Sequence, residues 1–182
     1  NDGTIESNTR NGIVNGANGK ITKIHNQSNG LIKTKKRWTI KNITGEIGEI
    51  ENSGTIQSLD EVAIRNHEGN ISTLNNSGTI SATHNTIQNL TDSTITGIIN
   101  SGTISSSGTK KKTIRNEGTI TSLSNSGTIS ATHNSNNDGT IHNFSTGTIT
   151  EITNSGNISS TATYGIENLG TITTITNTGT IT

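Results

Sequence analysis

The stretch Leu123-Ser-Asn125-Ser-Gly127-Thr-Ile129 decides the fold, because near-copies of it return along almost the whole chain. The Ile that closes each Gly-x-Ile recurs from Ile47 to Ile129 at steps of 9 residues alternating with steps of 15 or 16. Two motifs therefore make one unit of about 24 residues. A fixed period of this size indicates a stack of repeats, in which each unit buries its apolar face against its neighbours.

One stretch departs from this rhythm. Between Ile129 and Ile149 the step is 20 residues, and an additional Gly-Thr-Ile ends there at Ile141. This is the one stretch of the chain that is out of step with the repeat.

The composition agrees with a repeat stack and disfavours an ordinary globular core. Only 25% of the residues are apolar and 2% aromatic, yet 29 residues are Ile, most of them at the phased positions. Ile is β-branched and favours strands, so a column of Ile can form a core without aromatic rings. The chain has no Pro, which would remove a ladder donor, and no Cys, which excludes disulfides.

The local pattern predicts short strands joined by bends. Apolar and polar residues alternate around Leu74 and Ile80, as in strands. Ile95 and Ile98 stand three residues apart, so the chain must bend for both side chains to point inward. Asn and Gly tolerate left-handed backbone angles, and we expect them to form the corners in that conformation.

The predicted fold is therefore all-β: a single-stranded right-handed parallel β-helix with about 24 residues per coil and seven to eight coils. Stacked coils would give a rod of roughly 35 Å. The right hand follows by analogy from the size of the coil. We treat residues 1–182 as one continuous β-helix segment, and expect it to be excised from a longer repeat protein because it opens and closes within a repeat.

Asn recurs two residues after the inward Ile or Leu. Stacked Asn amides can hydrogen-bond from coil to coil, so we expect one structural Asn column. Its members are Asn52, Asn66, Asn76, Asn89, Asn100, Asn116, Asn125, Asn154, Asn168 and Asn177.

The repeats Ile50-Glu-Asn52-Ser-Gly54-Thr-Ile56 and Ile175-Thr-Asn177-Thr-Gly179-Thr-Ile181 resemble the β-helical passengers of Gram-negative autotransporters and related filamentous-haemagglutinin-like adhesins. The missing Cys is also similar to those passengers. The resemblance implies a non-enzymatic structural and adhesive segment at the bacterial cell surface or secreted from the cell. The secretion route is an inference about the parent chain, since these residues contain no signal peptide, translocating barrel or protease motif.

The long arcs between motifs vary most, and variable loops on a constant scaffold commonly carry binding chemistry. Two basic stretches lie there, three coils apart, with a Trp that could stack on a sugar ring. We expect them to contact an anionic glycan or a phosphate group through Lys33, Lys35, Lys36, Arg37, Trp38, Lys110, Lys111 and Lys112.

Two functional alternatives to the adhesin remain open. Outward Thr-x-Thr pairs are similar to the arrays of β-helical ice-binding proteins, although Lys20, Glu46 and Asn70 interrupt the plane in earlier coils. The candidate ice-binding array is Thr94, Thr96, Thr119, Thr121, Thr148, Thr150, Thr171 and Thr173. The other alternative is a glycan-processing or tailspike-type β-helix.

We predict no catalytic residues, no metal and no cofactor. The thirteen acidic residues are spread thinly, and no pair recurs at a spacing that joins two carboxylates. His84 and His133 occupy equal places two coils apart, roughly 10 Å by stacking distance, which is too far for one metal ion. The expected partners are a host-cell glycan or protein, or like molecules by self-association. The zero net charge argues against nucleic acid, and no transmembrane segment is present.

Overall fold

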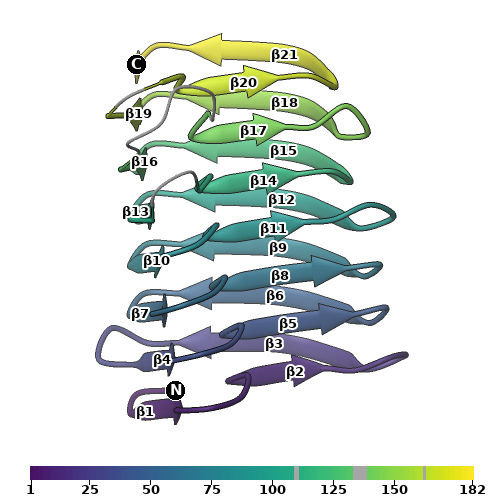
Figure 1. The fold of residues 1–182 in the computed structure, drawn as a ribbon, viewed down its shortest axis with the longest axis vertical. Coiled ribbons are helices and arrows are strands. Elements are labelled where there is room, and N and C mark those ends of the chain that lie inside the picture. Colours follow the sequence, from purple (N-terminus) through teal and green to yellow (C-terminus); the bar gives the residue numbers. More distant parts are fainter. Residues whose placement is uncertain (109–110, 133–138, 162) are drawn as a thin grey trace.

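Each coil of the chain passes through three short strands, and equivalent strands of successive coils lie side by side (Figure 1). The structure is a computed structural model that describes residues 1–108, 111–132, 139–161 and 163–182. Within these ranges all regular structure is β, in three parallel sheets that we call A, B and C. No helix in this part of the chain is long and apolar enough to cross a membrane.

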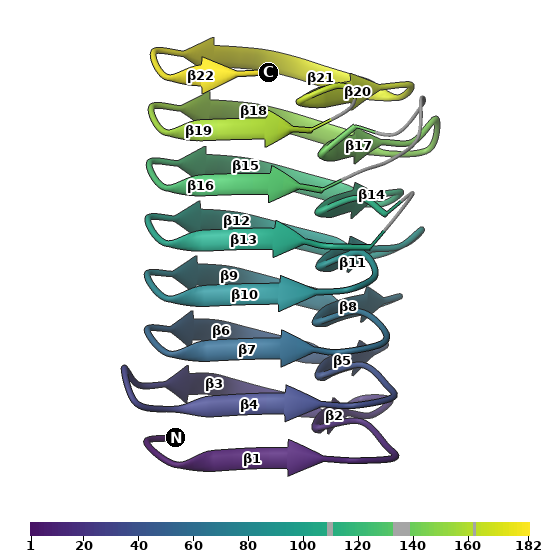
Figure 2. The ribbon, with the colours of Figure 1, turned by 60° about the vertical axis from the view of Figure 1, so that its left-hand side comes forward.

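The coil is right-handed. In Figure 2 the chain runs from left to right along the near strands, returns along the far strands, and rises from the N-terminus to the C-terminus. About seven turns of roughly 24 to 25 residues build the rod. The predicted fold class, a right-handed parallel β-helix, is thus confirmed.

Sheet A contains the short Thr-Ile-x-Ser motif. Its Ile and the fourth residue point inward, while the first and third residues point outward. The pairing is parallel and keeps identical positions opposite each other, for example Ile80 opposite Ile104. Its strands are β1 (Thr4–Ser7), β4 (Leu31–Thr34), β7 (Thr55–Ser58), β10 (Thr79–Ala82), β13 (Thr103–Ser106), β16 (Thr128–Ala131), β19 (Asn157–Ser160) and β22 (Thr180–Ile181).

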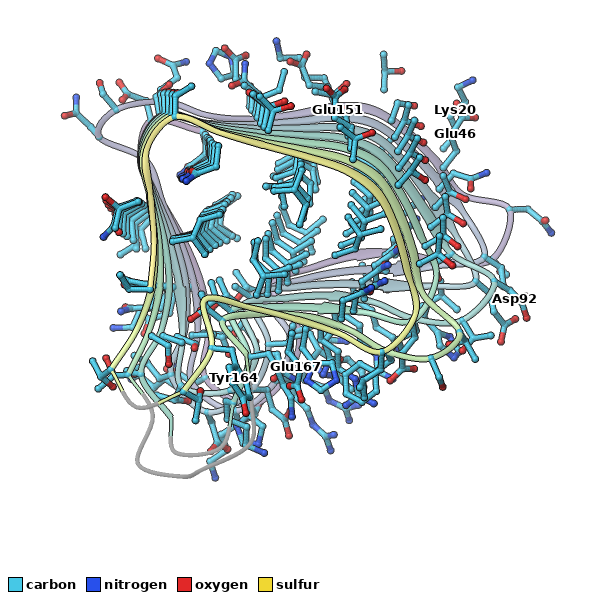
Figure 3. The ribbon with its side chains drawn as sticks, turned by 90° about the horizontal axis from the view of Figure 1, so that it is seen from above. Lys20, Glu46, Asp92, Glu151, Tyr164 and Glu167 are labelled. Carbon is cyan, nitrogen blue, oxygen red and sulfur yellow. The ribbon has the colours of Figure 1, made fainter. Side chains whose placement is uncertain are left out.

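Sheet C contains the longer motif with two inward Ile or Leu residues three positions apart. In the strand that holds Ile95 and Ile98, both side chains are fully buried. The expected bend lies within one continuous strand, and the curved side of the coil in Figure 3 shows it. The strands are β3 (Lys20–Asn26), β6 (Glu46–Asn52), β9 (Asn70–Asn76), β12 (Thr94–Asn100), β15 (Thr119–Asn125), β18 (Thr148–Asn154) and β21 (Thr171–Asn177).

Sheet B lies in the long arc and was not anticipated as a separate sheet. Each strand is an Ile-x-Asn in which Ile and Asn point inward and the middle residue points outward. Ile141, from the additional Gly-Thr-Ile of the out-of-step stretch, is one of these Ile residues and is in register with Ile114. The strands are β2 (Ile13–Asn15), β5 (Ile40–Ile43), β8 (Ile64–His67), β11 (Ile87–Asn89), β14 (Ile114–Asn116), β17 (Ile141–Asn143) and β20 (Ile166–Asn168).

The Asn residues form two ladders, at two corners of the coil, where the sequence suggested a single column. In each ladder one Asn Nδ2 donates to the Asn Oδ1 of the next coil over 2.7 to 3.0 Å. The ladder between sheets C and A contains Asn1, Asn26, Asn52, Asn76, Asn100, Asn125, Asn154 and Asn177. The ladder between sheets B and C contains Asn15, Asn42, Asn66, Asn89, Asn116, Asn143 and Asn168.

The glycines at the corners serve close packing and not the left-handed conformation that we expected. No described Gly has a positive φ, whereas Asn18, Thr44, Glu68 and Asp92 do. A Cβ atom at Gly102 would collide with the carbonyl oxygen of Gly78 in the coil below. The stacking distance of the coils therefore selects Gly at this corner.

Hydroxyl side chains fasten the third corner, between sheets A and B. A Thr precedes the inward Ile in several strands of sheet B, and its hydroxyl donates to a sheet A carbonyl of the next coil. Thr39 donates to Gln57 over 2.8 Å, and Thr86 donates to Ser105 over 2.6 Å. The Thr hydroxyl bond fixes the end of the loop before it, while the length and sequence of that loop differ from coil to coil.

Candidate functional site

The outer face of sheet B carries a row of side chains, one from the middle of each Ile-x-Asn, and most of them have an ionisable group. Strand pairing places Lys41 opposite Arg65, and Arg115 opposite His142. Figure 3 shows nitrogen-ended side chains gathered outside this sheet near Glu167. The members of this sheet B row are Val14, Lys41, Arg65, Gln88, Arg115, His142 and Glu167.

Trp38 organises the first part of the row. It directly precedes Thr39, whose hydroxyl bond fixes the start of β5, so the indole lies beside the outward side chains of β5 and β8. The Lys41 Nζ is 4.3 Å from the centroid of a Trp38 ring, and the Arg65 Cζ is 4.6 Å from it. We call Trp38, Arg37, Lys41 and Arg65 the Trp38 cluster.

The cations of the Trp38 cluster repel one another. The pKa of Lys41 is lowered by burial and then by the positive charges of Arg65 and Arg37. The pKa of Arg65 is lowered mainly by burial, with an opposing contribution from Glu61. Among the described residues no carboxylate lies within ion-pair distance of Arg37, Lys41 or Arg65. The Trp38 cluster is therefore a concentration of positive charge that the protein does not neutralise by contact.

A hollow of about 530 Å³ adjoins this cluster at the corner between sheets A and B. Besides Arg37 and Trp38, its walls include Thr9, Arg10 and Asn11 from the loop of the coil below. Asn11 Oδ1 and Trp38 Nε1 are buried and have no hydrogen-bond partner in the described part of the chain. The hollow thus combines guanidinium groups, hydroxyl and amide groups and an aromatic wall.

A second aromatic ring, Phe144, lies over the later part of the row. Its ring stacks on His142 with centroids 3.9 Å apart, and Arg115 Cζ is 4.8 Å from its centroid. Here carboxylates are present: Glu117 accepts from Arg115 Nε over 2.7 Å, and Glu167 lies 2.7 Å from His142 Nδ1. We call Phe144, Lys112, Arg115 and His142 the Phe144 cluster. It resembles the Trp38 cluster in form but contains its own counterions.

The two basic stretches predicted as a glycan contact belong to different parts of the rod. Lys33 lies on the outer face of sheet A, and Lys35 pairs with Glu6 at 3.5 Å. Lys36 is exposed on the loop, whereas Arg37 and Trp38 line the hollow. Lys111 and Lys112 lie on the corresponding loop three coils later, where Lys112 Nζ is 5.7 Å from the Phe144 centroid. Lys110 lies outside the described residues.

The predicted Thr array lies on the outer face of sheet C. Thr94, Thr119, Thr148 and Thr171 occupy one register position on β12, β15, β18 and β21. Thr96, Thr121, Thr150 and Thr173 are exposed two residues further along the same strands. In earlier coils the same positions carry other side chains, and Lys20 pairs there with Glu46 at 3.2 Å (Figure 3). The hydroxyl array thus spans four coils; the next strand, β9, carries Asn70 at the same position, and the charged region lies beyond it.

That charged region of sheet C is internally neutralised. Lys23 Nζ lies 3.1 Å from Glu49 and 2.5 Å from Glu51. The hydrogen bond to Glu51 raises the pKa of Lys23, and the same bond lowers the pKa of Glu51. These carboxylates face cations on the neighbouring coil, so their arrangement is that of a surface ion-pair ladder.

The structure describes four of the five histidines. His84 lies in the loop between sheets A and B, and His133 lies outside the described residues. In the described ranges no group of three or more His, Asp or Glu side chains is placed to hold a metal ion.

Sequence reasoning missed Lys41, Arg65, Arg115 and Phe144. The signal was present: a cation stands between Ile and Asn in Ile40-Lys-Asn42, Ile64-Arg-Asn66 and Ile114-Arg-Asn116. This pattern of cations can be recognised only when Ile-x-Asn is interpreted as a strand whose middle residue points outward.

Comparison with protein-family models, with curated proteins and with solved structures gives no match to this chain.

Proposed function

We propose that the protein is a non-enzymatic, rod-shaped segment of an adhesin displayed on a bacterial surface or secreted, and that its long arcs make the contacts with partners. The observation that carries this proposal is the Trp38 cluster on the outer face of sheet B, whose cations have no carboxylate in ion-pair contact among the described residues. Like charges held together cost free energy in the free protein, so their retention favours a role in binding an anionic partner.

The contrast with the rest of the rod supports the same proposal. The inward Ile columns and the Asn ladder between sheets C and A are nearly identical from coil to coil. A stack of this kind offers a stiff scaffold on which exposed residues can vary at little cost. The resemblance of the repeats to autotransporter passengers is the basis for the bacterial surface and for that secretion class within the proposal.

The experiment is adhesion of protein-coated beads to cultured host cells. The triple variant Arg37→Gln, Lys41→Gln, Arg65→Gln removes the Trp38 cluster's charge. A control variant with the same charge change, Lys20→Gln, Lys23→Gln, Lys33→Gln, alters the other two faces. Wild type and control are expected to adhere, and the triple variant to lose most adhesion. Absence of adhesion by the wild-type protein, or equal adhesion by all three, contradicts the proposal.

A second candidate, ice binding, is favoured by one observation: the in-register Thr columns on four successive strands of sheet C. Regularly spaced hydroxyls on a stiff sheet could match a repeating lattice. The test is thermal hysteresis at high micromolar concentration, with Thr121→Lys as the variant that places a charge in the middle of the array. Growth of ice unaltered by the wild-type protein removes this candidate.

A further inference from the structure

We propose that the Trp38 cluster and the adjoining hollow form a binding site for an acidic saccharide, whose carboxylate or sulfate group is bound between Lys41 and Arg65. This inference rests on the proposed adhesive function and names the class of ligand and its site. It moves the predicted glycan contact from the loop lysines to side chains of β5 and β8.

Charge and position are the first argument. Lys41 and Arg65 are direct neighbours across two parallel strands, and the same indole contacts both. An anion placed between them would relieve their mutual repulsion and accept hydrogen bonds from an ammonium and a guanidinium group. The ring restricts both cations before binding, so less side-chain freedom is lost when the anion arrives.

The hollow supplies the second argument, which concerns hydroxyl groups. Its size, about 530 Å³, falls in the range of sites for small molecules. Trp38 Nε1 is a buried donor and Asn11 Oδ1 a buried acceptor, both without partners among the described residues. A sugar hydroxyl can accept from the first and donate to the second once the covering side chains move, which removes the cost of two unpaired polar groups.

The same geometry disfavours a nucleic acid, which would also be anionic. Proteins that bind single strands provide free aromatic faces on which bases stack. Both Lys41 and Arg65 lie over the indole of Trp38, and His142 occupies the ring of Phe144. The aromatic rings of this surface therefore order cations, and the remaining polar groups suit a saccharide.

The Phe144 cluster provides an internal control. It also stacks an arginine on a ring, but Glu117 and Glu167 already supply its anions. A saccharide carboxylate would have to displace a carboxylate of the protein there. We therefore expect the first cluster to bind and the second to remain inactive.

The experiment uses the fluorescence of Trp38, the only Trp in the chain, so any change in emission reports on this site. The probes are a sulfated tetrasaccharide of the heparin type, an unsulfated oligosaccharide of uronic acids, inorganic sulfate, and an oligothymidine of equal charge. We expect saturable changes with one or both saccharides and weaker binding of sulfate and oligothymidine. The relative affinities of the two saccharides identify the preferred acidic group.

Variants locate the site. Lys41→Gln and Arg65→Gln are each expected to weaken saccharide binding by about tenfold, as loss of a charged hydrogen bond does. Arg115→Gln, with the same change of charge in the neutralised cluster, should bind like the wild type. Circular dichroism melts establish that each variant is folded. Equal affinity of the Arg65→Gln and Arg115→Gln variants, or oligothymidine binding as tight as that of the saccharides, overturns the proposal.

The outcomes separate this site from the function on which it rests. Adhesion of the beads without binding of either saccharide leaves the adhesive function standing and overturns the site. Saccharide binding that is lost in the Arg65→Gln variant, together with absence of adhesion, upholds the site and overturns the adhesive function.

Discussion

The coil has a short arc, from sheet C to sheet A, and a long arc, from sheet A through sheet B to sheet C, and the two differ in how constant their lengths are. From Asn52 onward, every corner between sheets C and A takes four residues from Asn to the next Ile, as from Asn100 to Ile104. The loops between sheets A and B have no such constancy: five residues lead from Ala82 to Ile87, and ten lead from Ala131 to Ile141. The chain is therefore uniform at the corner between sheets C and A and variable in length at the corner between sheets A and B.

The physical origin of this difference is the kind of contact that joins adjacent coils at each corner. At the corner between sheets C and A, backbone atoms of adjacent coils approach so closely that only Gly fits, and each Asn must meet the Asn of the next coil. At the corner between sheets A and B, a hydroxyl at the end of the loop makes the connection, and the number of residues before it differs from coil to coil. Constant positions therefore carry stability, and variable ones are available for binding.

The largest expected effect comes from breaking the short arc at Gly102. In the Gly102→Ala variant the new methyl group collides with the Gly78 carbonyl, and no rotamer can avoid it. We expect the free energy of unfolding to fall by about 3 kcal/mol or more in urea titrations. The control is Gly97→Ala, where the nearest atom to the added Cβ is 3.7 Å away. Equal stability of the two variants would contradict the role of close coil packing.

A smaller but clear loss is expected for Asn100→Ala. The amide of Asn100 donates to Asn125 over 2.8 Å and to Thr128 over 3.1 Å, and it accepts from Asn76 over 2.8 Å. Its removal leaves buried groups unpaired in two neighbouring coils, which costs about 2 to 3 kcal/mol. Asn75→Ala, on the outer face of the same sheet, should change stability by less than about 0.5 kcal/mol. Equal melting temperatures of the two variants would show that the Asn ladder does not stabilise the stack.

The smallest effect on stability is expected in the long arc, at Arg65→Gln. Loss of the contacts of Arg65 with Trp38 and Gln88 is opposed by relief of its repulsion of Lys41, so stability should change by about 1 kcal/mol or less. The pKa of Lys41 should rise toward its ordinary value of 10.5, because Arg65 contributes to lowering it. NMR titration of labelled lysines measures this change, with Lys23 as the unaffected reference. A Lys41 pKa that is the same in variant and wild type would refute the repulsion within the cluster.

The lowered pKa of Lys41 also makes the stability of the fold depend on pH. Folding lowers the pKa of Lys41, so the folded protein binds this proton less tightly than the unfolded chain. The charge of Lys41 therefore costs stability below its folded pKa, and this cost disappears as the pH rises through that value toward 10.5. Anion binding has the opposite dependence, since it needs the charged form and weakens over the same interval.

Much of the fold could be predicted because local patterns and coil stacking demand the same residues. The spacing from Ile95 to Ile98 predicted a bend, and the structure confirms it within β12. The steps of 9 and 15 predicted the coil, since each inward Ile must lie above its counterpart. The third sheet was missed because Ile114-Arg-Asn116 was read as the first half of the motif that ends at Ile120, and not as a strand of its own.

The candidate site could be predicted less well. The sequence pointed to Arg37 and Trp38, which do line the hollow, but grouped them with lysines next to them in the chain. Lys35 instead pairs with Glu6, and the cations that contact the indole come from β5 and β8. Arg65 is 27 residues from Trp38 in sequence, and only the register of the coils brings them together.

The amino-acid pattern alone was sufficient for the coil, its approximate length and its inward Ile columns, because burial repeats with every turn. The division of the Asn residues into two ladders and the choice of Gly for space depended on how adjacent coils meet. The clustering of Trp38 with Lys41 and Arg65 depended on it as well. Such contacts join residues about one coil apart, and loops of unequal length set which residues become neighbours. Stability is therefore encoded in the repeat itself, while the binding surface is decided by the stacking of coils.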